Sequence, residues 1–339
     1  MKIRFALVGV GQHARWAVIP ALECAQNCTL LAACDLQQEN LDSIQDDSVV
    51  KYKDYLAMLS AGGFDVVYVA TLEDLHEKMV VEAFKAGYHV VCEKPLGMNV
   101  LECESMLNAA KQAGKELVVG FEKRYHPEFI QIRNWIKDNR LGKVEAIHIQ
   151  EMWDMHKTFT KLSKRREEHL DRTGSLDCGI HSFDIIRFLT KGGDWSNVSA
   201  RGRWFGETDR KQMPHISVMA DLDNGVLATI TESYAYCTNI SQKKRCTTYV
   251  IVGTKGTINW AWDGDDEIKL SLIAEEGIET FEFEQMHHNE AIEKMVNDFA
   301  SYLLGESEWA ETLATGEDGL IAQQLVDEAL LQTHRYSAK

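Results

Sequence analysis

The stretch IRFALVGVGQHA, residues 3–14, decides the fold of this chain. An apolar, β-rich run (residues 3–8) leads into a turn with the pattern G-x-G-x-x-A (residues 9–14), and residues 17–25 then have helical spacing. In such a strand–turn–helix the first glycine permits a tight turn, the second lets the backbone approach a diphosphate, and the small third residue lets helix and strand pack. The diphosphate sits on the free N–H groups at the helix start. The stretch therefore predicts a dinucleotide site formed by Gly9, Gly11, Gln12, His13 and Ala14.

An acidic residue, Asp35, ends the second apolar run 21 residues after Ala14. A carboxylate at this point accepts hydrogen bonds from the adenosine ribose hydroxyls and repels a 2′-phosphate. We therefore expect NAD as the cofactor, with NADP as the alternative, because Asp35 alone carries the preference. A bare turn followed by a helix cap is the other interpretation. That interpretation accounts less well for a strand, a glycine turn, a helix and an acidic residue that all occur at the spacing of the dinucleotide-binding motif.

The first third of the chain alternates short apolar runs with amphipathic segments. Strand-like runs cover residues 30–34, 65–70, 89–92 and 117–121, and helical patterns cover residues 37–44, 75–86 and 100–113. The alternation predicts an α/β fold with a doubly wound parallel sheet. We place this dinucleotide-binding domain at residues 1–122.

The pattern of strand-like and helical segments changes after Arg124, and residues 123–339 form the second expected domain. After a helical segment (residues 128–137), strand-like runs follow one another at residues 144–153, 198–204, 216–222, 226–236, 247–252, 257–262, 269–273 and 280–283. Asn224-Gly225 between two of these runs is a strong hairpin signal. The chain returns to helical patterns at residues 289–304 and 316–333. We therefore predict an α+β domain with a large, mostly antiparallel sheet.

Composition excludes several functional classes. The chain has 339 residues, a formal net charge of −16 and eight cysteines. An acidic surface repels nucleic acid and anionic lipid, so we expect neither as a partner. The cysteines lack C-x-x-C pairs, which disfavours a structural zinc site and indicates reduced thiols in a cytoplasmic protein. No apolar run is long enough to span a bilayer.

Two further motifs carry candidate chemistry. Lys94, held extended before Pro95, follows an apolar strand whose carboxyl end faces the ligand side of such sheets. Taken by itself, Lys94 is better explained as a surface lysine on a loop. Asp177, His181 and Asp184 fall at i, i+4 and i+7, on one face of an expected helix. That face is consistent with catalysis, with a metal site lacking its further ligands, or with a polar stripe on a core helix.

At these residues the chain resembles the Gfo/Idh/MocA oxidoreductases, the family of glucose–fructose oxidoreductase and myo-inositol dehydrogenase. The resemblance runs nearly the full length. Besides the glycine turn and Asp35, it rests on Ala70-Thr71…His76, Ala86-Gly87…Cys92-Glu93-Lys94-Pro95-Leu96, Val119-Gly120-Phe121…Arg124-Tyr125…Pro127, Leu141-Gly142-Lys143-Val144 and Asp177…His181…Asp184.

The resemblance implies a Rossmann domain followed by a substrate-binding domain whose open sheet forms a homodimer or homotetramer. It implies a catalytic set of Lys94, Asp177 and His181. His181 takes the hydroxyl proton, since histidine titrates near neutral pH, and the Lys94 ammonium stabilises the alkoxide. Asp177 orients His181 or binds a substrate hydroxyl. Further cofactor contacts are implied for Thr71, His76, Glu93 and Lys94.

The implied activity is hydride transfer between the nicotinamide and a secondary hydroxyl of a sugar, sugar derivative or cyclitol. An NAD-dependent glycosidase that uses transient oxidation needs the same residues and is the alternative. An NAD-responsive regulator without catalysis ranks last, because Lys94 and His181 are both present. Leu72-Glu73 and the segment 172–175 depart from common family patterns. We therefore expect the loops around the pocket to differ from those of many relatives. Substrate contacts are expected, by location, from Arg124, Glu151, Trp153, Arg172, Asp184 and Tyr236.

Overall fold

The computed structural model describes residues 2–153, 176–204, 213–234, 245–264 and 267–336. It contains two compact units, which are described separately. The first comprises Met1–His126 and Met286–Gln323, and the second comprises Pro127–Gln285 and Gln324–Lys339. The first unit thus combines two distant pieces of sequence, whereas the sequence analysis divides the chain once, after residue 122.

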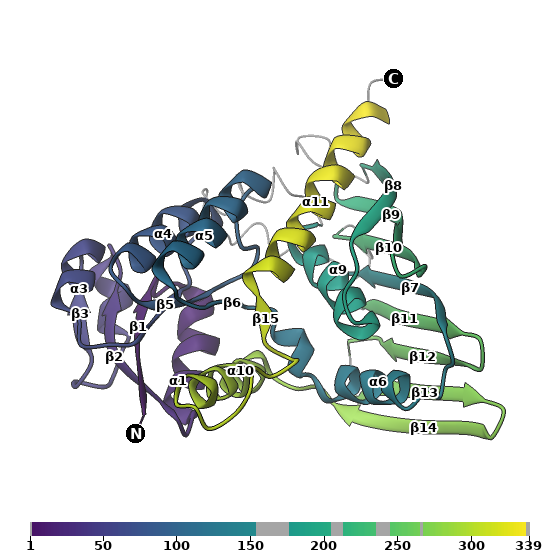
Figure 1. Ribbon diagram of the computed structural model, residues 1–339, viewed down its shortest axis with the longest axis horizontal. Helices are drawn as coiled ribbons and strands as arrows, with labels where there is room; N and C mark the ends of the chain where they lie inside the picture. Colours follow the sequence, from purple (N-terminus) through teal and green to yellow (C-terminus); the bar gives the residue numbers. More distant parts are fainter. Residues whose placement is uncertain (1, 154–175, 205–212, 235–244, 265–266, 337–339) are drawn as a thin grey trace, which may run out of the picture. The chain divides into compact units, whose positions relative to one another are not determined.

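The described part of the first unit contains a seven-stranded sheet in the order β15-β6-β5-β4-β1-β2-β3 (Figure 1). Its strands are β1 (Ile3–Val8), β2 (Cys28–Cys34), β3 (Val50–Tyr52), β4 (Val66–Val69), β5 (His89–Cys92), β6 (Leu117–Val119) and β15 (Ala314–Thr315). Strands β1 to β6 pair in parallel, and β15 pairs antiparallel with β6. The strand order reverses beside β1, which is where sheets of this kind bind ligands. The predicted doubly wound sheet is confirmed.

Helices cover both faces of this sheet. They are η1 (Ala14–Val18), α1 (Ile19–Cys24), α2 (Gln38–Asp42), α3 (Tyr55–Ala61), η2 (Glu73–Leu75), α4 (His76–Lys85), α5 (Val100–Ala113), η3 (Glu122–Tyr125), α10 (His288–Leu303) and the start of α11 (Gly316–Tyr336). In Figure 1, α4 and α5 lie on one side of the strands, and α1 and α10 lie on the other. The α5 bounds agree with the sequence pattern because the Asn99 side chain caps its first turn and Gly114 ends it with a φ of 61°.

Helix α10 belongs to the first unit because its apolar stripe lies in the core of that unit. Ala291, Ile292, Met295, Val296 and Phe299 are all at most 1% exposed and share one cluster with the apolar residues of β1, β2 and α1. Burying each of the larger side chains stabilises the fold by about 1.5–3 kcal/mol. Sequence position alone assigns α10 to the neighbouring unit, but this burial decides the matter.

The second unit is built on an eight-stranded sheet within its described residues, in the order β14-β13-β12-β11-β7-β10-β9-β8. The strands are β7 (Val144–Met152), β8 (Trp195–Arg203), β9 (His215–Leu222), β10 (Leu227–Ser233), β11 (Cys246–Gly253), β12 (Gly256–Trp262), β13 (Glu267–Ala274) and β14 (Gly277–Glu284). Only β7 and β10 pair in parallel; the other neighbours are antiparallel, with the predicted Asn224-Gly225 turn between β9 and β10. The predicted, mostly antiparallel sheet is confirmed.

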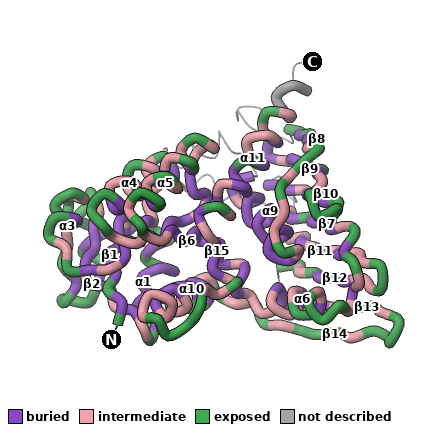
Figure 2. The backbone as a smooth tube through the Cα atoms, viewed as in Figure 1, coloured by how far each residue is buried: buried purple, intermediate pink, exposed green. Residues whose placement is uncertain are grey.

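Helices α6 (Pro127–Lys137) and α9 (Leu176–Thr190) belong to the second unit and pack against each other, and α11 (Gly316–Tyr336) enters this unit from Gln324 onward. Helix α9 contacts β7 and β10 and is buried along its length (Figure 2). Strands β9, β10, β11 and β13 alternate buried and accessible residues, as expected for a sheet covered on one face. On the accessible side Met219 is 50% exposed and Leu227 is 37% exposed.

Candidate active site

The glycine turn follows β1 at the carboxyl edge of the first sheet. Gly9 has a φ of +92°, and a Cβ built there would lie 2.5 Å from the carbonyl oxygen of Ala70 and 2.8 Å from the nitrogen of Thr71. A side chain at Gly9 is therefore excluded both by conformation and by the backbone that follows β4. A Cβ at Gly11 meets nothing within 4 Å. Gly11 thus leaves open space, which a group approaching the turn can occupy.

Asp35 is fixed beside this turn by two backbone hydrogen bonds. The amide of Val10 donates to one carboxylate oxygen at 2.8 Å, and the amide of Gln37 donates to the other at 2.8 Å. A carboxylate has about four acceptor positions, so each oxygen keeps capacity for a hydroxyl donor. The open space at Gly11 and the oriented Asp35 together fit a dinucleotide whose ribose lies at the end of β2.

The helix after the turn starts with an irregular segment. Gln12 is exposed, His13 is half-buried, and residues 14–18 form a short π-helix that leads into α1, whose second residue is Pro20. Proline has no N–H to donate to the preceding turn, and wide turns of this kind are common near functional sites. The amide of Arg15 donates to the Gly11 carbonyl at 3.1 Å, so the helix begins at the glycine turn itself. Its N-terminal N–H groups lie where the sequence predicts the diphosphate.

A chain of polar contacts crosses the carboxyl edge from β4 to the glycine turn. The Tyr68 hydroxyl donates to Glu93 Oε1 at 2.7 Å, and His13 Nε2 lies 3.2 Å from the same oxygen. Burial opposes the Glu93 charge, but the nearby His13 outweighs it and lowers the pKa of Glu93. Burial, with the Glu93 charge, raises the pKa of Tyr68 well above its usual value. The sequence analysis assigned Glu93 and His13 to the cofactor site but did not connect them.

The loop after β5 carries Lys94 and is tied to the β4 loop. Lys94 is half-buried and precedes a cis peptide bond to Pro95. His76 is fully buried, with Nδ1 at 2.9 Å from the Pro95 carbonyl oxygen and Nε2 at 3.3 Å from the Thr71 carbonyl oxygen. His76 therefore joins two loops that carry expected cofactor residues. The geometry supports a role in holding Thr71 and Lys94 in place.

In the second unit, α9 carries Asp177, His181 and Asp184. These residues are 3%, 6% and 1% exposed, and they fall on one helical face as the spacing predicts. Gly179 lies between them in sequence, and a Cβ there would lie 2.7 Å from Cγ of Glu232. The missing side chain therefore lets α9 approach β10 closely.

Beneath α9, two glutamates lie side by side on the parallel strands β7 and β10. Glu151 and Glu232 are paired in register and are 3% and 0% exposed. Tyr249 donates to Glu151 Oε1 at 2.5 Å, and Ser182 of α9 donates to Glu232 Oε1 at 2.7 Å. Burial, followed by the Glu151 charge, raises the pKa of Tyr249 well above its usual value. Of these residues the sequence analysis singled out only Glu151.

Aromatic residues lie beyond the end of β7, close in sequence to Glu151. Trp153 lies edge-on to Tyr234 at 5.3 Å, and the Tyr234 hydroxyl accepts a hydrogen bond of 3.2 Å from the Cys178 amide at the start of α9. The Arg245 guanidinium lies over the rings of Trp153 and Trp262, 4.5 and 4.6 Å from their centroids. Trp153 is thus joined to the helix that carries Asp177. Arg172 and Tyr236, the remaining expected substrate contacts, lie outside the described residues.

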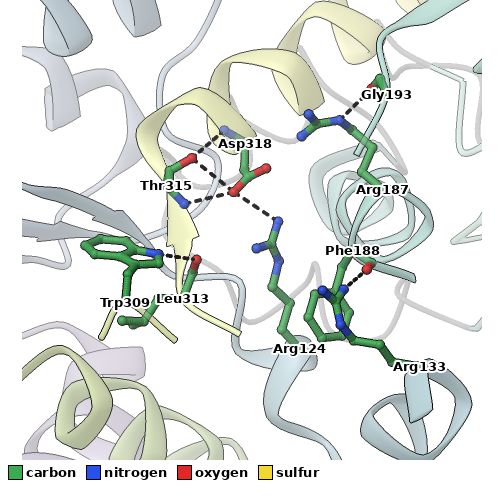
Figure 3. Close-up of polar contacts among 9 residues, drawn as sticks. All are labelled: Arg124, Arg133, Arg187, Phe188, Gly193, Trp309, Leu313, Thr315 and Asp318. Carbon is green, nitrogen blue, oxygen red and sulfur yellow. Dashed lines mark hydrogen bonds and ion pairs between the residues drawn. The ribbon is translucent and has the colours of Figure 1, made fainter. Parts of the chain in front are cut away.

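Arginine side chains fix the termini of α9 and α11 (Figure 3). Arg124, 4% exposed, lies 3.3 Å from Asp318, which also accepts hydrogen bonds from the amide and hydroxyl of Thr315. In the second unit Arg133 donates to the carbonyl of Phe188, and Arg187 donates to that of Gly193 at 2.8 Å. Carbonyls in the last turn of a helix lack helical partners, so Arg133 satisfies one of them. The contact made by Arg124 shows that it holds the start of α11.

In the described ranges, no group of three or more His, Cys, Asp or Glu side chains has a geometry that could hold a metal ion. Among the same residues, no helix combines the length and apolar character needed to cross a membrane.

Comparison with known proteins identifies two matching domain models. Residues 3–121 match the GFO/IDH/MocA oxidoreductase model with an NAD-binding Rossmann fold, and residues 129–259 match the C-terminal domain model of that family. An inositol 2-dehydrogenase from Rhizobium meliloti (strain 1021) is 24% identical over 97% of this chain and 96% of its own length.

Solved structures share the fold. An oxidoreductase from Agrobacterium radiobacter, in complex with NAD+, L-tartaric acid and magnesium, superposes with a TM-score of 0.83 at 20% identity, over 98% of this chain and 97% of its own. An aldose–aldose oxidoreductase from Caulobacter crescentus, complexed with glycerol, gives a TM-score of 0.82 at 22% identity, over 99% and 98%.

Proposed function

Because this chain belongs to the GFO/IDH/MocA oxidoreductase family, we propose that it oxidises a secondary hydroxyl of a sugar, sugar derivative or cyclitol with NAD. The inositol and aldose chemistry named for its relatives supports this substrate class. The observation that carries the proposal is the pair Asp177 and His181, one turn apart and buried at the start of α9. A buried acid next to a histidine is a suitable arrangement for taking a proton from a hydroxyl.

The cofactor would be held by the glycine turn, by Asp35 and by the residues after β4 and β5. When bound, NAD supplies the hydride acceptor. Asp35 favours NAD over NADP because a 2′-phosphate would meet its fixed carboxylate. Thr71 and Glu93 contribute from the neighbouring loops, which His76 joins.

The chain's own residues handle the proton and the charge. His181 accepts the hydroxyl proton as the substrate carbon is oxidised and returns it in the reverse direction. Lys94 stabilises the negative charge that develops on the oxygen. Asp177 orients His181 or accepts a hydrogen bond from a neighbouring hydroxyl, and Glu151, Trp153 and Asp184 contribute to substrate recognition.

The test is a screen of sugars, sugar acids and inositols for NADH formation, followed by His181→Ala and Lys94→Ala. Each variant should lose about a hundredfold or more of kcat, the usual contribution of an acid–base group. The double variant should lose little more than the worse single variant, since groups that act on one step are not additive. Lys85→Ala is the matched control, because this lysine is exposed and pairs only with Glu82 among the described residues. Unchanged turnover in both single variants would refute the assignment.

The stoichiometry of the reaction tests the class of enzyme. A dehydrogenase forms one NADH for each substrate molecule consumed, whereas a glycosidase with transient oxidation consumes substrate without accumulating NADH.

We further propose that copies of the chain associate through the accessible face of the second sheet, where Met219 and Leu227 are exposed. Light scattering of the wild type and of Met219→Lys tests this, and a monomeric wild type would contradict it.

A further inference from the structure

The feature that the proposed chemistry leaves unexplained is the ion pair between His13 of the glycine turn and Glu93 at the end of β5. His13 is the fifth residue of the G-x-G-x-x-A pattern, where the pattern itself requires no particular side chain. Its ring reaches from the first turn of the helix to the carboxyl end of β5, with Nε2 at 3.2 Å from Glu93 Oε1. The contact therefore joins the segment that binds the diphosphate to the segment that carries Lys94.

Both members of the pair are held from other directions. Glu93 receives the Tyr68 hydroxyl at 2.7 Å, and a Cβ at Gly120 would lie 3.1 Å from Glu93 Oε2, so the carboxylate fills the space that Gly120 leaves. His13 packs edge-on to Trp16 at 5.5 Å between ring centroids. Neither group can turn away without losing these contacts.

A second histidine–carboxylate pair lies beside the first. Trp16 also packs edge-on to His288 of α10 at 5.1 Å, and His288 Nδ1 lies 3.1 Å from Glu122 Oε1. Four elements thus bring ionisable groups to one edge of the first unit: the glycine turn, the ends of β5 and β6, and the start of α10.

The charges that face His13 favour its protonated form. Burial opposes protonation and so does Lys94, but Glu93 and, more weakly, Glu122 outweigh them and raise the pKa of His13 above its ordinary value. The ring is half-buried rather than sealed, so it can exchange protons with solvent. Its charge therefore changes with pH near the physiological range.

We infer that His13 is a cofactor-positioning residue: as an imidazolium it holds the Glu93 carboxylate in place and adds a positive charge to the turn that binds the diphosphate. The inference rests on the proposed function and deepens its cofactor site. The helix N-terminus offers only partial positive charge, and the imidazolium adds a full one close to it. NAD and NADH carry the same diphosphate, so His13 should act on both.

The inference fixes the sign of a pH effect. The diphosphate favours protonated His13, so the bound protein keeps this proton to higher pH than the free protein. Dinucleotide binding then takes up a proton in the interval between the two pKa values. Affinity is constant below this interval and falls as the pH rises through it.

Calorimetric titration with NAD and with NADH between about pH 6 and pH 9, in buffers of different ionisation enthalpy, measures affinity and proton uptake together. The wild type should lose about tenfold in affinity across this range, the scale of one charge-assisted contact. His13→Gln should bind weakly at every pH without proton uptake. His13→Lys should keep most of the affinity up to pH 9, because its charge does not titrate there.

His89→Gln is the matched control. His89 begins β5, at the opposite end of the strand from Glu93, and accepts a hydrogen bond from the Glu116 amide that glutamine can also accept. It should leave affinity and proton uptake unchanged. If His13→Gln folds poorly, an NMR titration of the wild-type His13 ring gives an independent reading. Glu93→Gln should lower its midpoint, because the attracting charge is removed.

Tight dinucleotide binding that is independent of pH in the wild type would overturn this inference and leave the proposed function intact. Equal pH dependence in His13→Gln and the wild type would also overturn it. Failure of the wild type to bind either NAD or NADP would overturn the proposed function itself. A His13 midpoint below the ordinary value of about 6.5 in the free protein would remove the imidazolium on which the inference depends.

Discussion

Replacing Gly9 by alanine tests the geometry of the cofactor turn most directly. Gly9 lies between two fixed backbone segments: its own amide donates to the Cys34 carbonyl at 2.9 Å, and the Ala70 amide donates to the Val8 carbonyl at 2.9 Å. These hydrogen bonds hold β1, β2 and β4 in register. The methyl group of an alanine would lie 2.5 Å from the Ala70 oxygen, so the strand ends would have to separate.

Two terms set the size of the effect. A non-glycine residue held at a φ of +92° costs about 1–3 kcal/mol, and forcing a methyl group into packed backbone costs about 1–3 kcal/mol more. We therefore expect Gly9→Ala to lower the free energy of unfolding of the first unit by about 2–6 kcal/mol, or its Tm by roughly 4–24 °C. Gly11→Ala is the matched variant, since its methyl group meets nothing within 4 Å.

Thermal unfolding followed by circular dichroism, together with NAD titration, separates the two glycines. Gly9→Ala should lose both stability and binding. Gly11→Ala should keep its Tm within about 2 °C, as for an unhindered substitution, but bind NAD at least about tenfold more weakly because the methyl group occupies the diphosphate approach. A Gly9→Ala protein with wild-type Tm and affinity would refute the reasoning. So would a Gly11→Ala protein destabilised as much as Gly9→Ala.

Three further substitutions give distinct outcomes. Asp35→Asn removes the charge but keeps one acceptor oxygen, so NAD affinity should fall about tenfold while NADP gains relative to NAD; titration with both cofactors measures the ratio. Burial, assisted by Lys115, lowers the pKa of His89 to about 4. Between that pH and about 6.5, His89 is therefore protonated in the unfolded chain but not in the folded protein. The free energy of unfolding should therefore decrease by about 1–2 kcal/mol as the pH is lowered through this window, and His89→Gln should flatten the Tm-against-pH curve. Parallel curves for the variant and the wild type would contradict this. Tyr249→Phe removes the donor to buried Glu151 and should cost about 1–3 kcal/mol in denaturant unfolding, and an unchanged midpoint would show that the contact contributes nothing.

The sequence predicts elements well where local chemistry sets their ends. The bounds of α5 follow from Asn99 and Gly114, which are readable in the sequence. The sequence analysis does not predict the short β3 (Val50–Tyr52) and α3 (Tyr55–Ala61), because three and seven residues are too few to show a clear hydrophobic period. The parallel pairing of β7 with β10 also could not be predicted, because register between distant strands depends on how the whole sheet packs.

The candidate site divides in the same way. The glycine turn and Asp35 are predictable because each acts within one local motif, and α9 with Asp177 and His181 forms as their spacing indicates. The contact between Tyr68 and Glu93 was not predictable. Tyr68 lies in the apolar run DVVYVA, where an aromatic residue is most simply part of the core, and only the fold brings its hydroxyl to the end of β5. The same holds for Glu232 beneath α9.

The dependence of the first unit on α10 and β15 affects the order in which the protein matures. Ribosomes add about 5–20 residues per second and domains generally fold as units. All the residues we assign to the cofactor site are synthesised within the first third of the chain, yet the helix that completes their core ends at Leu303 and the edge strand at Thr315. The nascent cofactor-binding unit therefore stays incomplete while residues Pro127–Gln285 of the second unit are synthesised. A nonsense mutation shortly before His288 would leave every cofactor residue in place and still yield a polypeptide prone to degradation.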